Sequence, residues 1–133
     1  MESRIKKLEQ MLKNDRFASC NNIRLVSVTK GEAVAEMLIS ENHLNGVNII
    51  QGGALFTLAD FAFAAASNSH GRIAVASNAS INFFKGVSDG RLTAKATEIS
   101  SGKTLATYSV EITSDDGSKI ALFTGTAFMK GEY

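Results

Sequence analysis

The chain has 133 residues, of which 44% are hydrophobic and 20% charged, and its formal net charge is +1. These values are ordinary for one globular domain with a core of its own, so we treat residues 1–133 as a single domain. A net charge so close to zero gives no electrostatic reason to expect a nucleic-acid or membrane partner.

The single cysteine, Cys20, excludes an internal disulfide and suits a reducing compartment. No apolar stretch reaches the length of a bilayer span, and the charges between Glu2 and Glu9 argue against a signal peptide. We therefore expect a cytoplasmic protein. We expect Cys20 to be a buried, inert thiol. The two histidines and one cysteine of the chain do not have the spacing of metal ligands, so no metal site is expected.

The chain begins with a segment, residues 1–16, that predicts an amphipathic helix over about 3–14. Its apolar residues fall on one stripe among lysines and glutamates: Ile5, Leu8, Met11 and Leu12. Two β-rich runs follow, at 23–30 and 33–39. The turn between them, Lys30-Gly31-Glu32, predicts a hairpin.

A long helix is expected from Ala54 to about Ser69. This run is rich in alanine, leucine and phenylalanine and contains neither proline nor glycine, so its helix propensity is high. Because it is apolar nearly all the way round, we expect a central helix enclosed by other elements.

The C-terminal half predicts four strands separated by turn residues. The expected strands are 73–84, 91–100, 104–113 and 118–129, and the turns contain Ser88-Asp89-Gly90, Ser101-Gly102 and Asp115-Asp116-Gly117. Consecutive hairpins favour an antiparallel sheet with the long helix across one face, which is an α+β fold.

Asp60 is the only formal charge between Glu41 and Arg72. Moving a carboxylate out of water without a partner is costly, so a lone acid in an apolar helix calls for a functional reason. Gly52 and Gly53 lie at the start of the same helix, where N–H groups without a partner in the helix lie at the positive end of its dipole. Glycine lets a ligand approach these donors closely, as an oxyanion would.

Each of these features has a plainer interpretation. Asp60 could be a structural acid that pairs with Arg72 or accepts a hydrogen bond from Thr57. The two glycines could simply form a turn into the helix.

The spacing of the two features predicts a dimer. Asp60 follows Gly53 by seven residues, so both lie on one side of the helix but about 10 Å apart along its axis. That distance is too great for both to act on one carbonyl group within a chain. Two helices packed antiparallel about a two-fold axis would bring Asp60 of one chain to Gly53 of the other.

Several stretches of the chain together resemble a known family. They are Asn45-Gly46, Gln51-Gly52-Gly53-Ala54-Leu55-Phe56-Thr57-Leu58-Ala59-Asp60-Phe61-Ala62-Phe63-Ala64, Asn68-Ser69-His70-Gly71, Ala74-Val75-Ala76-Ser77, Gly90-Arg91-Leu92-Thr93-Ala94, Gly102-Lys103 and Ala121-Leu122-Phe123-Thr124-Gly125. This pattern, spread over about residues 20–130, resembles the hotdog-fold acyl-CoA thioesterases of the PaaI type, the phenylacetate-pathway group.

The resemblance implies a hotdog fold, in which an antiparallel sheet wraps around the long helix. It implies hydrolysis of an aryl- or medium-chain acyl-CoA, with coenzyme A as part of the substrate and no further cofactor. Asp60 would be the nucleophile or general base, the backbone amide of Gly53 or Gly52 would polarise the thioester carbonyl, and Asn45 would orient the site. The partner chain would supply half of this site, in a tetramer of paired dimers.

One residue departs from the family pattern, since many relatives have histidine where this chain has Gln51. A glutamine amide still donates a hydrogen bond but does not ionise, so we keep Gln51 as a candidate site residue. Phe61, Ser77 and Asn78 are further candidates for substrate contact. Core packing explains Phe61 equally well, and a solvent-facing position explains the other two.

Two other functions remain open at this point. One is a non-catalytic acyl-CoA sensor on the same fold, for which the missing histidine is mild support. The other is a hotdog dehydratase acting on hydroxyacyl thioesters. That chemistry uses a histidine and an acid, so the glutamine at position 51 counts against it.

Overall fold

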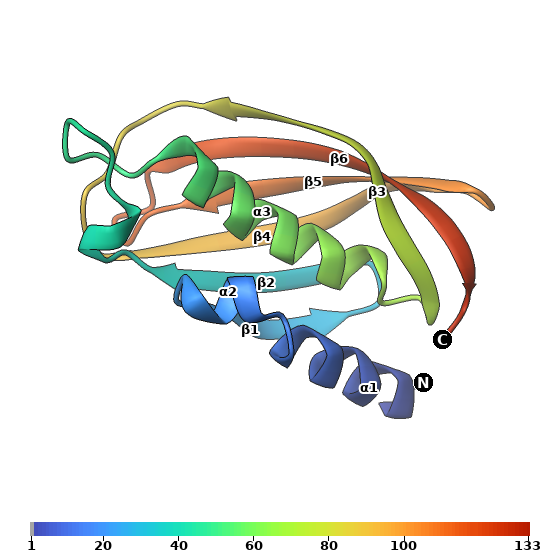
Figure 1. Ribbon diagram of the computed structural model, residues 1–133. Coiled ribbons are helices and arrows are strands. Elements are labelled where there is room, and N and C mark those ends of the chain that lie inside the picture. The colour runs from blue at the N-terminus through green and yellow to red at the C-terminus, as the bar shows by residue number, and fades with distance from the viewer. Residues whose placement is uncertain (1) are drawn as a thin grey trace.

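The computed structural model describes the backbone of residues 2–133 and the side chains of residues 4–133. Its elements are α1 (Glu2–Lys13), α2 (Arg16–Cys20), β1 (Ile23–Thr29), β2 (Glu32–Leu38), η1 (Glu41–His43), α3 (Gly52–Ser67), β3 (Arg72–Phe83), β4 (Arg91–Ser101), β5 (Leu105–Thr113) and β6 (Lys119–Glu132). The six strands form one antiparallel sheet in the order β1-β2-β4-β5-β6-β3. The sheet curves around α3, as Figure 1 shows, and the predicted α+β hotdog arrangement is confirmed.

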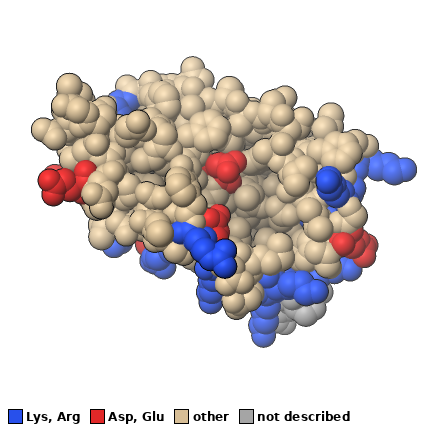
Figure 2. All heavy atoms as spheres, in the orientation of Figure 1, with Lys and Arg blue, Asp and Glu red and all other residues tan. Residues whose placement is uncertain are grey.

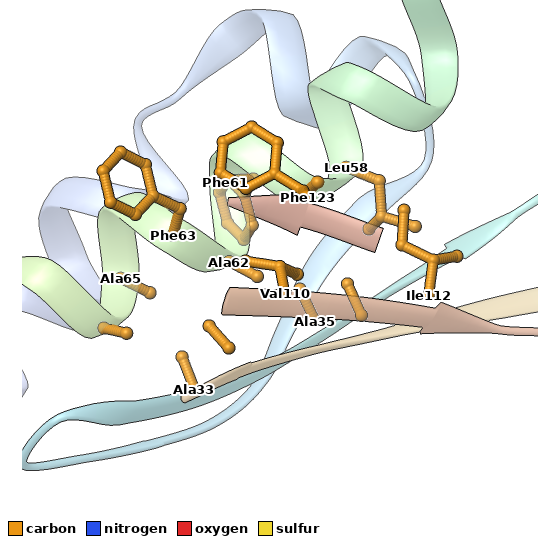
Figure 3. Close-up of a cluster of buried hydrophobic side chains, with 14 of the residues drawn as sticks. Ala33, Ala35, Leu58, Phe61, Ala62, Phe63, Ala65, Val110, Ile112 and Phe123 are labelled. Atoms are coloured by element: carbon orange, nitrogen blue, oxygen red, sulfur yellow. The ribbon is translucent and has the colours of Figure 1, made fainter. Parts of the chain in front are cut away.

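The helix lies close to the sheet because small residues face each other across the contact. The helix contacts β2 and β4, and the alanines Ala33 and Ala35 of β2 are buried together with Ala62 and Ala65 of α3. Figure 3 shows this layer beside the larger side chains that fill the rest of the core. Leu58 and Phe63 of the helix meet Val110, Ile112 and Phe123 of β5 and β6, all of them buried.

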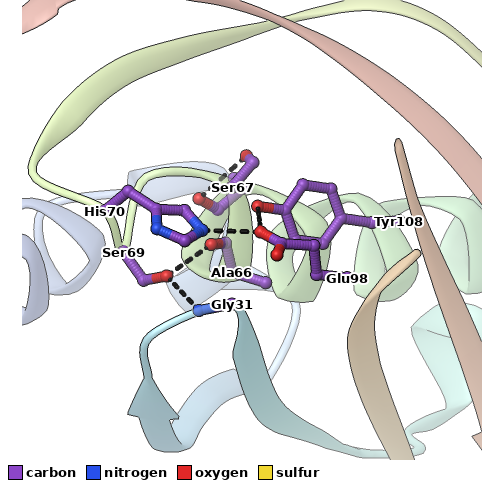
Figure 4. Close-up of polar contacts among 8 residues, drawn as sticks. Gly31, Ala66, Ser67, Ser69, His70, Glu98 and Tyr108 are labelled. Carbon is purple, nitrogen blue, oxygen red and sulfur yellow. Dashed lines mark hydrogen bonds and ion pairs between the residues drawn. The ribbon is translucent and has the colours of Figure 1, made fainter. Parts of the chain in front are cut away.

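A polar cluster, buried at Ser69 and part-buried at His70 and Glu98, joins the far end of α3 to the sheet (Figure 4). The Ser69 hydroxyl donates to the carbonyl of Ala66 (2.6 Å) and accepts from the N–H of Gly31 (2.7 Å). Glu98 on β4 bonds His70 Nε2 (2.6 Å) and accepts from the Tyr108 hydroxyl (2.9 Å). Burial acts to raise the pKa of Glu98, but the hydrogen bonds from His70 and Tyr108 outweigh it and hold that pKa below 4.5.

The predicted elements are found within a few residues of their expected ends. The long helix starts at Gly52 and ends at Ser67, and each predicted strand is present. The sequence did not reveal α2, whose five residues are too few for a periodic pattern. The Asp15 carboxylate caps this short helix by accepting from the Ala18 N–H at 3.0 Å. Cys20 at its end is exposed, so the prediction of a buried thiol is wrong.

The last strand in the sheet order, β3, has a free edge. It pairs only with β6, and most of its twelve residues are exposed. The pairing is irregular between Ala76 and Asn78, so Ser77 lies at a bulge. A long exposed edge strand offers unpaired backbone groups to another chain.

None of the helices in residues 2–133 combines the length and apolar character needed to cross a membrane.

Candidate active site

The start of α3 is held by the loop that precedes it. Leu44 and Ile50 form an isolated antiparallel bridge. The Gln51 N–H donates to the carbonyl of His43 (2.8 Å), and the Ile50 N–H donates to the carbonyl of Val87 (2.8 Å). Because these bonds join the two sides of the loop and tie it to the segment between β3 and β4, the loop fixes the position of the first turn of the helix.

The backbone donor expected of Gly53 is present but occupied. Gln51 is the N-cap of α3, and its side-chain oxygen Oε1 accepts the Gly53 N–H at 2.8 Å. A Cβ at Gly53 would lie only 2.7 Å from that oxygen. A side chain there would thus collide with whatever oxygen the amide binds, whether it belongs to Gln51 or to a ligand. The Gln51 side-chain oxygen therefore fills the acceptor position of the Gly53 N–H.

Hollows flank this helix terminus on two sides. We name the first the polar hollow: it has a volume of about 510 Å³ and is lined by Phe17, Asn42, His43, Gln51, Gly53 and Thr57, among others. We name the second the apolar hollow: it measures about 420 Å³ and its wall includes Ile49, Leu55, Phe83, Phe84 and Lys85. An open depression beside Asn45, Phe56 and Phe83 lies at Gly52 and Gly53 as well.

Asp60 lies two turns further along α3. It retains access to solvent in the single chain, and the side chains of residues 4–133 give it no hydrogen bond or ion pair. Figure 2 shows acidic atoms over the middle of α3, surrounded by uncharged surface. Desolvation by the surrounding protein, and secondly repulsion from Asp15, raises the pKa of Asp60 above its ordinary 3.8.

The plainer interpretations of Asp60 are not supported. The Thr57 hydroxyl donates to the carbonyl of Gly53 (2.8 Å). The Arg72 guanidinium donates to the carbonyls of Lys130 (2.9 Å) and Met129 (3.2 Å) on β6. With both proposed partners engaged elsewhere, the solvent-exposed Asp60 carboxylate is left available to a ligand or a second chain.

The other predicted site residues lie in several separate parts of the structure. The Asn45 Oδ1 accepts from the N–H groups of Val47 (2.9 Å) and Ile49 (3.2 Å), so this side chain shapes the loop before α3. Phe61 is buried and borders a separate cavity beside α1 and β1. Ser77 and Asn78 are exposed on β3. A single chain does not bring these last three residues to the polar or the apolar hollow.

A comparison with protein-family models identifies the family. The model described as "Thioesterase superfamily" matches residues 47–121, which include the end of the loop, α3, β3 to β5 and the start of β6. The chain belongs to this superfamily. It is accordingly an enzyme of the thioester-hydrolase class, and the resemblance to the PaaI type is confirmed.

Individual relatives agree with this assignment. The chain is 39% identical over 122 residues to the acyl-coenzyme A thioesterase PaaI of Escherichia coli, covering 91% of this chain and 87% of that protein. It is also 39% identical to a putative esterase of Archaeoglobus fulgidus, over 99% of this chain and 85% of the relative.

A solved structure of the E. coli PaaI protein superimposes with a TM-score of 0.92 at 36% identity, covering 98% of this chain and 96% of that one. A hypothetical thioesterase from Streptococcus pneumoniae, solved with coenzyme A, superimposes with a TM-score of 0.86 at 27% identity, covering 92% of this chain and 97% of that one.

His43 was not among the candidate site residues that the sequence indicated. The residue is buried, its Nδ1 caps η1 by accepting the Ser40 N–H, and it borders the polar hollow. Only the cross-strand pairing of the loop brings His43 next to Gln51, and no local sequence pattern revealed that pairing.

Proposed function

We propose that this superfamily member hydrolyses acyl-CoA thioesters to a free acid and coenzyme A. The observation that carries the proposal is the pairing, on one helix, of a lone carboxylate at Asp60, for which the described residues offer no hydrogen-bond partner, with an amide donor at Gly53. The names of the E. coli relative and of the coenzyme A-bound structure support the substrate class.

We propose that each active site is shared by two chains. Asp60 and Gly53 are separated by about 10 Å along one helix, so one chain alone does not present both to the same carbonyl group. The free edge of β3 and the exposed carboxylate on α3 support a two-fold dimer. The association of two such dimers into a tetramer rests on the family resemblance.

The proposed chemistry begins when the thioester carbonyl oxygen accepts the Gly53 N–H, where the helix dipole favours growing negative charge. Asp60 of the other chain then follows one of two routes. It attacks the carbonyl carbon, expelling the coenzyme A thiolate and leaving a mixed anhydride that water hydrolyses. Alternatively, it takes a proton from a water molecule that attacks the same carbon, and the thiolate leaves as the tetrahedral intermediate collapses.

The apolar hollow supports an aryl or medium-chain acyl group. Leu55, Phe83 and Phe84 supply apolar walls, and the hollow adjoins Gly52 at the helix start. Asn45 is proposed to orient the site through its side-chain NH2 group, because its oxygen is already engaged in the loop. No cofactor, and a cytoplasmic location, stay predictions from the sequence.

A panel of aryl- and alkyl-acyl-CoA substrates tests the proposal through release of free thiol. Wild-type turnover that is lost in Asp60→Asn, which keeps the shape and removes the charge, is the expected result. Full activity in Asp60→Asn would remove this residue from the mechanism.

A non-catalytic acyl-CoA sensor is the second candidate function. The occupied Gly53 amide favours it, since a capped donor is not free to activate a carbonyl group. Tight binding of acyl-CoA by the wild type without thiol release would identify a sensor.

A further inference from the structure

His43 is a buried histidine with one committed ring nitrogen. The side chain is 4% exposed, and its Nδ1 lies 3.0 Å from the backbone nitrogen of Ser40, which donates to it. Accepting this bond requires a lone pair on Nδ1, so the ring is neutral in this arrangement and its proton is on Nε2. His43 therefore presents one fixed N–H donor.

That donor has no partner among the side chains and backbone of residues 4–133. The hydrogen bonds of the ring all involve Nδ1. No fully buried side-chain nitrogen or oxygen in this part of the chain lacks a partner, so Nε2 is not sealed inside the protein. Since His43 borders the polar hollow, its free N–H opens into that hollow.

The pairing of the loop places His43 beside Gln51. Leu44 and Ile50 form the antiparallel bridge, so the next pair outward is His43 with Gln51, joined by the 2.8 Å bond from the Gln51 N–H. Directly opposed residues project their side chains to the same side, with Cβ atoms about 5 Å apart. The Gln51 carboxamide thus has two N–H donors within its reach, at Gly53 and at His43.

We propose that His43 is a positioning residue that draws the Gln51 carboxamide off the Gly53 amide when substrate binds. In the free chain Oε1 of Gln51 accepts the Gly53 N–H; in the substrate complex it accepts the His43 Nε2–H instead. The thioester carbonyl oxygen then takes the vacated Gly53 N–H. This inference rests on the proposed thioesterase function.

The hydrogen-bond partner of the Gln51 carboxamide determines which end of the group faces the substrate. Gln51 has an acceptor end and a donor end, and only its NH2 end attracts a carbonyl oxygen. A bond from His43 to Oε1 turns the NH2 group toward the substrate, giving the oxygen a second donor beside Gly53. Without His43 the carboxamide has no fixed donor to hold it away from the helix terminus.

Two matched variants separate this role from a structural one. In His43→Asn the side-chain oxygen replaces Nδ1 as acceptor for the Ser40 N–H, but the Nε2 donor is lost. In His43→Gln the amide reaches the Nε2 position as a donor, but the acceptor for Ser40 is lost. A purely structural role would therefore make His43→Gln the more damaging change in both thermal stability and activity.

Thiol release from acyl-CoA and thermal unfolding are measured for both variants and the wild type. We expect His43→Asn to lower kcat/KM about five- to tenfold, the effect of one hydrogen bond, while its Tm stays near that of the wild type. We expect His43→Gln to retain more activity than His43→Asn despite a lower Tm.

The same measurement in a Gln51→Ala background tests whether His43 acts through Gln51. There we expect His43→Asn to cause no further loss, because the side chain it positions is gone. An unchanged kcat/KM in His43→Asn alone, or an equal loss in both backgrounds, would overturn the inference while wild-type turnover leaves the proposed function intact. A wild type that releases no thiol would overturn both.

Discussion

Gln51→Glu should make the protein more stable and far less active. The substitution replaces only the NH2 group of the side chain by oxygen, so the carboxylate can accept the Gly53 N–H as the carboxamide does at 2.8 Å. The new bond is charge-assisted and lies at the positive end of a 16-residue helix. We expect a gain of about 1 kcal/mol in the free energy of unfolding, or a rise in Tm of about 3–5 °C.

The same substitution, Gln51→Glu, should lower catalytic activity although it raises stability. A carboxylate held on the Gly53 amide places a negative charge where the substrate oxygen should become negative, and it supplies no N–H donor of its own. Loss of an oxyanion donor costs about 3–4 kcal/mol of transition-state stabilisation, so kcat/KM should fall about 10²–10³-fold.

Thermal unfolding and thiol release, measured on the same preparations, check both effects. Gln51→Ala is the matched control: it removes the cap, lowering stability by about 1 kcal/mol, but introduces no charge. It should keep more activity than Gln51→Glu. A Gln51→Glu protein with raised Tm and activity within about threefold of the wild type would refute a role for the Gly53 amide in binding the carbonyl.

Three further predictions concern residues outside the helix terminus. Asp15→Asn keeps the cap of α2 but removes the charge that helps raise the pKa of Asp60, so the acid limb of the kcat/KM profile should move to lower pH. Glu98→Gln should lower stability by about 1–3 kcal/mol at pH 7 in thermal or urea unfolding. Because the pKa of Glu98 is lowered in the folded state, its contribution to the free energy of unfolding is present above pH 4.5 and is lost as the pH falls through the folded-state pKa. The stability difference between Glu98→Gln and the wild type should therefore shrink in acid. Gly125→Ala should cost about 1–3 kcal/mol in urea unfolding, because its Cβ would come within 3.0 Å of the buried Phe63 ring.

The fold was predictable because its elements carry strong local signals. The long helix is rich in helix-forming residues, and turn sequences such as Asp115-Asp116-Gly117 separate the strands. The order of the strands was not predicted, since hairpins alone do not say which strand follows β2 in the sheet; the family resemblance implied only a hotdog arrangement. The exposure of Cys20 was missed because α2, too short to be recognised, places it on the surface.

The sequence was enough to propose candidate site residues but not to predict their contacts. The isolation of Asp60 and the two glycines can be read directly from the chain, and their spacing indicates a second chain. The occupation of the Gly53 amide by Gln51 depends on a side-chain conformation, which no sequence pattern specifies. The place of His43 depends on cross-strand pairing in an irregular loop, which has no repeating signal.

The account depends most on the sharing of each active site between two chains, and subunit mixing tests this directly. Asp60→Asn removes the acid, and Gly53→Val blocks the amide while displacing only the flexible end of Gln51. Each variant alone should be inactive. Unfolded together and refolded as a 1:1 mixture, they should recover about a quarter of wild-type specific activity, because half of the dimers are mixed and each mixed dimer has one intact site. A mixture that forms mixed dimers but stays inactive would show that both groups must come from the same chain, contradicting the account.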